Sequence, residues 1–548
     1  MPRIGRREFL RATAATLAAW AAVRVPAGGA EPASRINLLF LMTDQQRFDA
    51  MSCAGNPVLR TPNLDRLARE GARFTRFYSS CPVCTPARAV ILTGRSLEST
   101  TIRTNGDCAR NDLPDLPTFD QILLRNGYRG EYHGKWHVPY KFALDYNRPV
   151  RWLNGKNAPP GCKAETSEAA AFTAYVAANV PARPPAQGEL ASKDGYYVPD
   201  PLDSRYGGAA AEKSSQAEMY GCLNVPPEHT HTAWTCKEGL EALDRLKDGP
   251  FTLTISIGPP HPPMVVAKPY YGMIPAASIP VPTSIDDPRT DSPYAESRKE
   301  GKGSPYRDKD KIRQMASDYY GLVAEVDDWI GRILKRLDDL GLAGRTLVIF
   351  TSDHGEMLGE HGLHGKGVFY EGAVHVPLLM RLPGVIPPGT VVQTPASHLD
   401  LFATILDYCG LSGPQSEGES LRPFIEGKRD GAGRIIVSEW ANPAVPGFMV
   451  FDGRWKLLFG RTAKAPSVDA LYDLKTDSQE MTNLLGSKGD VEKARPEAER
   501  LKAALVDWLA KRKSPLLEGV KARAAQQLSA VEQLSLLNTP SASKPAGS

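Results

Sequence analysis

The sequence predicts an α/β fold, with a large domain built on a central, mostly parallel sheet between helices and a small C-terminal α+β domain with an antiparallel sheet. Three observations support this. Several apolar runs break off abruptly into polar residues, as buried parallel strands do where they enter loops. Helical periodicities lie between these runs, and alternating strands and helices indicate a parallel sheet covered on both faces. After about residue 430 the pattern changes to short strand-like runs.

Three apolar runs are the predicted core strands, and each is followed by polar residues. The runs and their successors are Ile36 to Thr43 before Asp44 and Gln45, Phe251 to Ile257 before His261, and Thr346 to Thr351 before Asp353 and His354. Open sheets place their sites beyond the carboxyl ends of their strands. We therefore expect these polar side chains to lie at one edge of the sheet.

Helices are predicted between the strands. Pro62 to Glu70 carries its apolar residues on one face, with Thr61 as the expected N-terminal cap and Gly71 as the expected terminator. A longer helix is predicted from Met315 to Leu337, where apolar residues recur at spacings of three and four.

Two long insertions, 156 to 215 and 262 to 312, are rich in proline, glycine, serine and charged residues. Loops of such length are uncommon unless they are functional or disordered. We expect them to form walls of a substrate pocket.

The small domain is predicted from three short runs and one helix. These are Ile435 to Val437, Phe448 to Phe451, Trp455 to Phe459, and Pro496 to Lys511 with the proline at the first helical position. The expected boundaries are 36–430 for the catalytic domain, 431–513 for the small domain and 514–548 for an extension. Its last residues, Thr539 to Ser548, have the composition of a disordered tail.

Residues 1–30 resemble a bacterial twin-arginine signal peptide. Arg6 and Arg7 precede a weakly apolar stretch of twelve residues and a small-residue exit that ends at Ala30. This resemblance implies a periplasmic or secreted protein whose partners include the twin-arginine export machinery.

Charge and cysteine content exclude several classes of protein. The net charge of +4 comes from the first thirty residues, and the remainder is balanced, so no electrostatic footprint for nucleic acid is expected. No apolar run approaches the roughly 20 residues of a membrane span. Eight cysteines are too few for a disulfide scaffold of this length, although Cys222 and Cys236 are candidates for a pair.

The segment from Ser80 to Arg95 is the most informative. Pro86 can open a helix, which would put Cys84 at the positive end of that helix and Arg88 one turn inside it. The helix dipole and the guanidinium would then both stabilise a thiolate. Taken alone, the same pattern also fits a buried structural cysteine.

The segment Cys84-Thr85-Pro86-Ala87-Arg88, followed by Leu92-Thr93-Gly94-Arg95, resembles the C-x-P-x-R and L-T-G-R signature of the type I sulfatases, which are formylglycine-dependent members of the alkaline phosphatase superfamily. The stretches TDQQRFDA, GYRGEYHGKWH and SDHGEMLGEHGLHGKG extend the resemblance over roughly 36 to 510. The resemblance implies the alkaline phosphatase fold. It also implies a maturation enzyme that converts Cys84 to formylglycine.

The resemblance further implies a divalent cation held by Asp44, Gln45, Asp353 and His354 together with the modified Cys84. Carboxylate and amide oxygens suit Ca²⁺. Many relatives have Asp and Asn where Gln45 and His354 stand. The combination of Gln and His at these two positions is more similar to that of choline-sulfatases and phosphonate monoester hydrolases. Nitrogen ligation is also compatible with Mn²⁺ or Mg²⁺.

Five further residues match catalytic positions of the family. Lys135 and Lys366 correspond to its sulfate-binding lysines, although a lone lysine beside glycine is more typical of a solvated turn. His137 corresponds to the base that acts on the formylglycine, and His261 to the acid that protonates the leaving group. Arg88 is expected to orient the formylglycine.

Other polar residues are weaker candidates. His229 and His231 precede an amphipathic segment and are expected on the surface or in a helix cap. Candidates for pocket-lining or substrate contact are Thr104, Asn105, Asp107, His361, His364 and His375.

The function predicted from these residues is an exported, metal-dependent sulfatase that acts on an aryl, choline or carbohydrate sulfate. A phosphonate monoester or phosphodiester hydrolase is the alternative within enzymes. The alternative from another class is a non-catalytic binder of sulfated glycans in which Cys84 stays a thiol.

Overall fold

The fold is described from a computed structural model that covers residues 35–110, 112–143, 146, 150–151, 167–192, 194–201, 203, 219–295, 305–462 and 468–523. The predicted signal peptide and the predicted disordered tail lie outside these residues. The domain boundaries proposed at 430 and 513 stay predictions.

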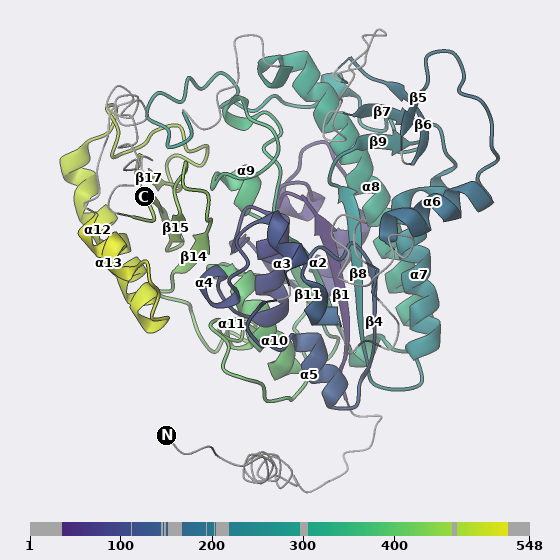
Figure 1. Ribbon diagram of the computed structural model, residues 1–548, viewed down its shortest axis with the longest axis horizontal. Coiled ribbons are helices and arrows are strands. Elements are labelled where there is room, and N and C mark those ends of the chain that lie inside the picture. Colours follow the sequence, from purple (N-terminus) through teal and green to yellow (C-terminus); the bar gives the residue numbers. More distant parts are fainter. Residues whose placement is uncertain are drawn as a thin grey trace, which may run out of the picture. The chain divides into compact units, whose positions relative to one another are not determined.

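A seven-stranded sheet forms the centre of the large part, in the order β12-β2-β11-β10-β1-β8-β4 (Figure 1). Its strands are β1 (Asn37–Asp44), β2 (Ala72–Phe74), β4 (Arg129–Gly134), β8 (Phe251–Pro260), β10 (Thr346–Ser352), β11 (Leu378–Arg381) and β12 (Thr390–Val392). β1 pairs in parallel with both β10 and β8, and only β11 runs against its neighbours. The three predicted core strands and the mostly parallel sheet are confirmed.

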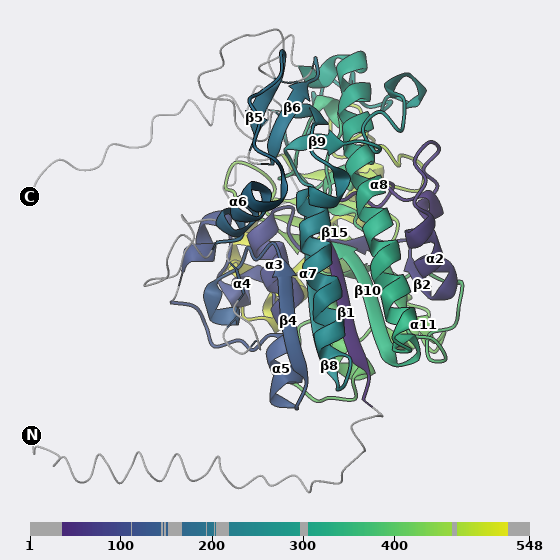
Figure 2. The ribbon, with the colours of Figure 1, turned by 90° about the vertical axis from the view of Figure 1, so that its right-hand side faces the viewer.

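Helices cover both faces of this sheet (Figure 2). On one face, Leu38 and Phe40 of β1 pack against α3 (Cys84–Thr93), α5 (Phe119–Arg125) and α10 (Leu401–Tyr408). On the other face, Leu39 and Leu41 pack against α2 (Pro62–Glu70), α7 (His231–Leu246) and α8 (Lys309–Asp339). Alternate residues of a strand point to opposite faces, so an unbroken apolar strand is the expected centre of this layered core.

The predicted helix from Pro62 to Glu70 is confirmed as α2, but the predicted role of Thr61 as its cap is wrong, and Gly71 stands at its end for a reason other than its conformation. The Thr61 side chain does not cap the helix and instead accepts a hydrogen bond from the Ser52 backbone N–H at 2.9 Å. Gly71 has a φ of −148°, which any residue can adopt. A Cβ at this position would lie 2.1 Å from the Met380 carbonyl oxygen. The close approach of β11 therefore requires the glycine.

The small C-terminal sheet is antiparallel, in the order β14-β15-β16-β17. Its elements are β14 (Ile436–Glu439), β15 (Phe448–Phe451), β16 (Trp455–Phe459) and β17 (Ala470–Asp473), followed by α12 (Val491–Lys511) and α13 (Leu517–Ala522). The three predicted runs are confirmed. The predicted start of α12 is wrong, because Asp490 caps the helix at the Lys493 N–H and leaves Pro496 inside it.

The two insertions contain more regular structure than the predicted loops. They carry α6 (Glu168–Asn179) and most of a second four-stranded sheet, β5 (Leu190–Ser192), β6 (Gly195–Pro199), β7 (Tyr220–Leu223) and β9 (Met264–Ala267). Shorter elements complete the described fold: β3 (Phe77–Tyr78), β13 (Ala396–Ser397), α4 (Leu97–Thr100), α9 (Glu371–Val374) and α11 (Arg422–Ile425).

The suggested disulfide between Cys222 and Cys236 is wrong, because both thiols are free. Cys236 is buried on the face of α7 that packs under the main sheet, whereas Cys222 lies on β7. Within the described residues, no helix combines the length and the apolar character that a membrane crossing requires.

Candidate active site

The polar residues that follow the core strands meet at the carboxyl edge of the sheet. Asp44 is the last residue of β1, and Asp353 and His354 follow β10 directly. Thr43 is in register with Ser352, so the two strand ends lie side by side, and the Gln45 N–H donates to Asp353 Oδ1 at 3.1 Å. Ligand atoms of Asp44, Cys84, Asp353 and His354 lie within 4.8 Å of one another, and all four residues are buried.

Cys84 reaches this cluster from the start of α3, where it is the first helical residue after Val83. Its Sγ lies 3.1 Å from His354 Nε2 and 3.2 Å from Lys366 Nζ. This sulfur stands where the oxygens of an oxidised side chain would be. The helix start therefore places position 84 among the predicted metal ligands, as the sequence indicated.

Arg88 lies one turn further along α3 and bridges the two carboxylates. Its Nε donates to Asp353 Oδ2 at 2.7 Å, and Nη2 donates to Asp44 Oδ2 at 3.0 Å. Nη1 donates to Ser256 Oγ at 2.8 Å and to the Lys135 carbonyl at 3.0 Å. The guanidinium thus ties together the ends of β1, β10, β8 and β4. Ser256 was not predicted, because its hydroxyl does not stand out in the run Phe251 to Ile257, which also contains Thr252 and Thr254.

Two lysines from different segments contact the cluster. Lys135, which follows β4, forms an ion pair with Asp44 and places its Nζ 3.9 Å from Cys84 Sγ. Lys366 comes from the loop before α9, and its Nζ donates to Gln45 Oε1 at 2.8 Å. Position 84 therefore has two ammonium groups within 3.9 Å, an arrangement that favours an anionic group bound beside it.

The predicted base and acid both lie at the site. His137 is buried close enough to Cys84 for this residue to affect its pKa, and its Nδ1 has no hydrogen-bond partner among the described residues. His261 follows β8, and its Nδ1 donates to the Pro262 carbonyl at 2.7 Å, so Nε2 remains for proton exchange. Burial, Lys135 and Arg88 lower the pKa of His137. Burial, Lys366 and Lys135 lower the pKa of His261 well below its usual value.

Burial and the neighbouring charges have opposite effects on the pKa values of several groups in the cluster. Burial and Asp44 would raise the pKa of Cys84, but Lys135, Lys366 and His354 lower it well below the usual value. Burial likewise opposes ionisation of Asp44, yet the surrounding cationic groups hold its pKa far below the usual range. Burial and the neighbouring Asp44 raise the pKa of Asp353. The cationic groups therefore stabilise the ionised form of Asp44, whereas Asp353 is not fully compensated.

These residues fit a divalent cation. Asp44 Oδ1 is buried without a hydrogen-bond partner among the described residues, as an oxygen reserved for a ligand would be. Gln45 has a left-handed φ of 71°, and its amide Nε2 donates to Glu356, so its Oε1 is held toward Lys366 and the cluster. Strained backbone of this kind is concentrated at functional sites. Glu356 was not predicted, although it lies two residues after His354.

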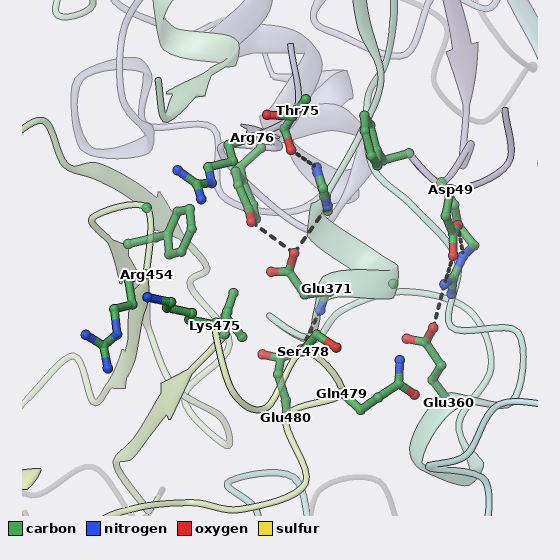
Figure 3. Close-up of a pocket in the computed structure, with 18 residues that line it drawn as sticks. Asp49, Thr75, Arg76, Glu360, Glu371, Arg454, Lys475, Ser478, Gln479 and Glu480 are labelled. Carbon is green, nitrogen blue, oxygen red and sulfur yellow. Dashed lines mark hydrogen bonds and ion pairs between the residues drawn. The ribbon is translucent and has the colours of Figure 1, made fainter. Parts of the chain in front are cut away.

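The weaker candidates are dispersed. Asn105 Oδ1 accepts from the Thr85 N–H at 3.0 Å and so supports the start of α3, whereas Thr104 and Asp107 cap each other. His361 stacks on Tyr370 and His364 on Tyr306. His375 lines a different cavity of ≈ 610 Å³, beside Glu371 (Figure 3).

His231 corrects the expectation of a surface or capping role. It is the first residue of α7, and it lines a pocket of ≈ 300 Å³ that also contains Lys135 and His261. Both insertions contribute to the walls of this pocket, as expected.

The family model for sulfatases matches residues 36–411, and a model described as N-sulphoglucosamine sulphohydrolase, C-terminal, matches residues 359–507. The chain therefore belongs to the sulfatase family, the sulfuric ester hydrolases of the alkaline phosphatase superfamily.

Similar proteins span most of the chain. An N-acetylglucosamine-6-O-sulfatase from Bacteroides thetaiotaomicron is 28% identical over 505 residues, which cover 83% of this chain and 84% of the relative. The multifunctional alkaline phosphatase superfamily protein PehA from Trinickia caryophylli is 30% identical over 427 residues, covering 72% and 78%. The solved phosphonate monoester hydrolase SpPMH from Silicibacter pomeroyi has a TM-score of 0.68 at 25% identity, covering 88% of this chain and 97% of that one. The predicted fold class is confirmed.

Proposed function

We propose that this protein hydrolyses sulfate esters at position 84 after Cys84 has been converted to formylglycine, with a divalent cation held by Asp44, Gln45, Asp353 and His354. The observation that carries the proposal is the position of Cys84 Sγ, which lies 3.1 Å from His354 Nε2 and 3.2 Å from Lys366 Nζ. A hydrated aldehyde supplies two hydroxyl groups, one to attack sulfur and one to help release the sulfate. A bound divalent cation polarises oxygen atoms beside it.

The chain's own residues have distinct proposed roles. Lys135 and Lys366 hold the sulfate oxygens beside position 84. Arg88 keeps the carboxylates of Asp44 and Asp353 in place, because it hydrogen-bonds to both. His137 takes a proton from the hydroxyl group at position 84. His261 gives a proton from Nε2 to the leaving alcohol, once a bound anion offsets the lysines that lower its pKa.

We infer Ca²⁺ as the cation, because three of the four proposed side-chain ligands offer oxygen. His354 contributes a nitrogen atom, so Mn²⁺ and Mg²⁺ are the alternatives to test. We also infer export through the twin-arginine machinery from residues 1–30, and maturation by an enzyme that reads Cys84 to Arg88.

A phosphonate monoester or phosphodiester hydrolase is the second candidate function. The Gln45 and His354 pairing favours it, as does the similarity to a solved phosphonate monoester hydrolase. The site speaks against a non-catalytic glycan binder, because Arg88, Lys135 and Lys366 all contact Cys84 or the carboxylates beside it.

Two chromogenic substrates separate these activities. We expect kcat/KM for 4-nitrophenyl sulfate to exceed that for bis(4-nitrophenyl) phosphate on one preparation of the mature protein. The physical reason is that a sulfate monoester presents three terminal oxygens to the ammonium groups of Lys135 and Lys366, whereas a phosphodiester presents two and must place a second aryl group. A strong preference for the phosphodiester would instead establish the second candidate function.

Removal of the cation should abolish turnover and lower the thermal stability. A ligand that binds only the folded state stabilises it by about 2.7 kcal/mol at one hundred times its dissociation constant. We expect EDTA to lower the melting temperature, and Ca²⁺ to restore both stability and activity better than Mn²⁺ or Mg²⁺.

The control for this experiment is Asp353→Asn, which removes one proposed ligand charge. Its melting temperature should respond much less to EDTA and to Ca²⁺. An unchanged response in this variant would place the cation elsewhere.

A further inference from the structure

The pocket beside the reaction centre is lined by charged groups of both signs. Lys135, whose Nζ lies 3.9 Å from Cys84 Sγ, lines it together with His261, and the carboxylates of Glu168, Asp194 and Glu325 also line it. Of the described residues that line this pocket, Lys135 is the only lysine or arginine. The three carboxylates come from different elements, since Glu168 begins α6, Asp194 precedes β6 and Glu325 lies on α8.

Glu168 carries an unsatisfied charge. Its side chain is 3% exposed, and its Oε1 lies 3.0 Å from His231 Nε2. Its Oε2 has no hydrogen-bond partner among the described residues. A buried carboxylate oxygen without a partner is costly, and such groups are found mainly where a ligand, a water molecule or an ion completes them.

The other two carboxylates are also short of positive charge. Asp194 is 7% exposed, and its Oδ1 has no partner among the described residues. Glu325 accepts a hydrogen bond from Thr230, but burial, together with Asp328 and Asp194, raises its pKa to about 7. A bound cation would stabilise all three groups at once.

This wall is unfavourable for an ordinary sulfate ester. Carboxylates beside an anion-binding centre repel the substrate, and because these three are buried, bulk water does not screen them fully. A substrate with a positive group on its alcohol reverses the sign of this interaction. Its sulfate would lie beside the lysine and its cation beside the carboxylates.

On the basis of the sulfatase function proposed above, we propose that the preferred substrate is a sulfate ester whose leaving alcohol carries a protonated amine, bound by Glu168 and Asp194. The free acceptors of the wall match the N–H donors of such an amine. Thr232 Oγ, which also lines the pocket and has no partner among the described residues, adds a third acceptor. Phe172 supplies an apolar surface for the carbon chain between the two charges.

A matched pair of esters tests this proposal. 3-Aminopropyl sulfate and butyl sulfate have chains of equal length and differ only in a terminal ammonium or methyl group. We expect the kcat/KM of the amine to be higher by at least about ten-fold, the factor that 1.4 kcal/mol represents. The difference should appear mainly in KM, because the ammonium lies away from the reacting sulfur.

Glu168→Gln should reduce this ratio several-fold, and Asp194→Asn should reduce it as well. Both esters are measured on the same preparation, so a loss of folded protein cancels in the ratio. The matched control is Glu241→Gln, because Glu241 is an exposed carboxylate on α7 outside the pocket. It should leave the ratio unchanged.

Hydrolysis of 4-nitrophenyl sulfate separates a failure of the amine proposal from a failure of the sulfatase proposal. If the wild-type protein hydrolyses it and yet treats the amine and butyl esters alike, the amine proposal is wrong and the sulfatase proposal stands. If the ratio of the kcat/KM values for the amine and butyl esters is unchanged in Glu168→Gln and Asp194→Asn, these carboxylates do not bind the amine. If no sulfate ester is hydrolysed, the proposed function fails, and the amine specificity fails with it.

Discussion

Replacing Cys84 with alanine should lower kcat for 4-nitrophenyl sulfate by at least about 10⁴-fold, the scale on which loss of a nucleophile acts in hydrolases. The lysines, Arg88 and the carboxylates would stay in place around an empty position, because none of their mutual contacts passes through Sγ. Cys84→Ser should show the same loss in a host whose maturation enzyme converts only cysteine.

The accompanying measurement is mass spectrometry of the tryptic peptide from Phe77 to Arg88. We expect an aldehyde at Cys84 and an intact thiol at Cys81, whose pKa burial raises well above the usual value. Cys53→Ala is the control for activity, since this thiol lies outside the site. Full activity of Cys84→Ala would refute the proposed nucleophile.

Replacing Lys456 with methionine should destabilise the protein by about 3–5 kcal/mol, the cost of removing one partner from a buried charged network. Lys456 is fully buried on β16, and its Nζ lies 2.9 Å from Glu371 Oε1 and 2.8 Å from Glu480 Oε1. Figure 3 shows these two glutamates close together at the edge of the larger cavity. Without the ammonium, two buried carboxylates would face each other, with only Tyr78 and His375 left to stabilise Glu371.

The pKa values of the glutamates show what the lysine balances. Burial opposes ionisation of Glu371, yet Lys456 and His375 hold its pKa far below the usual value. Burial and repulsion from Glu371 raise the pKa of Glu480 to about 7 even with Lys456 present. The loss should be seen as a lower urea midpoint at neutral pH.

Two variants show whether charge is the cause. Lys475→Met, at an exposed lysine of the same cavity, should change the free energy of unfolding by no more than about 0.5 kcal/mol. Glu480→Gln added to Lys456→Met should recover part of the lost stability, because only one buried carboxylate then remains. If the double variant is no more stable than Lys456→Met, packing and not charge is what Lys456 provides.

Much of the fold and part of the site could be predicted from local patterns. Apolar runs that end in Asp44 and Asp353 identified β1 and β10, and parallel strands bring such ends to one edge of a sheet. Spacings of three and four residues identified α2 and α8. These patterns were sufficient because they record which face of an element is buried.

Other features could not be predicted from neighbouring residues in the sequence. Gly71 was predicted to end a helix by its conformation, but the backbone of β11, more than 300 residues away in the sequence, is what requires it. Cys222 and Cys236 looked like a possible pair, yet Cys236 is buried in the core beneath the main sheet and Cys222 is only partly buried on β7. His231 looked like a residue of a helix cap, and only the packing of α6 against α7 places it beside Glu168.

The order of residues along the chain determined the family, the layered α/β architecture and the set of side chains gathered at the carboxyl ends of the strands, because periodicity and contiguous motifs are local properties. Only the tertiary structure decided that Arg88 bridges Asp44 and Asp353, that Glu356 orients Gln45, and that three carboxylates line the pocket beside His261. Those contacts join segments far apart in the sequence. Their charges interact strongly only because the residues are buried together, away from the screening of water.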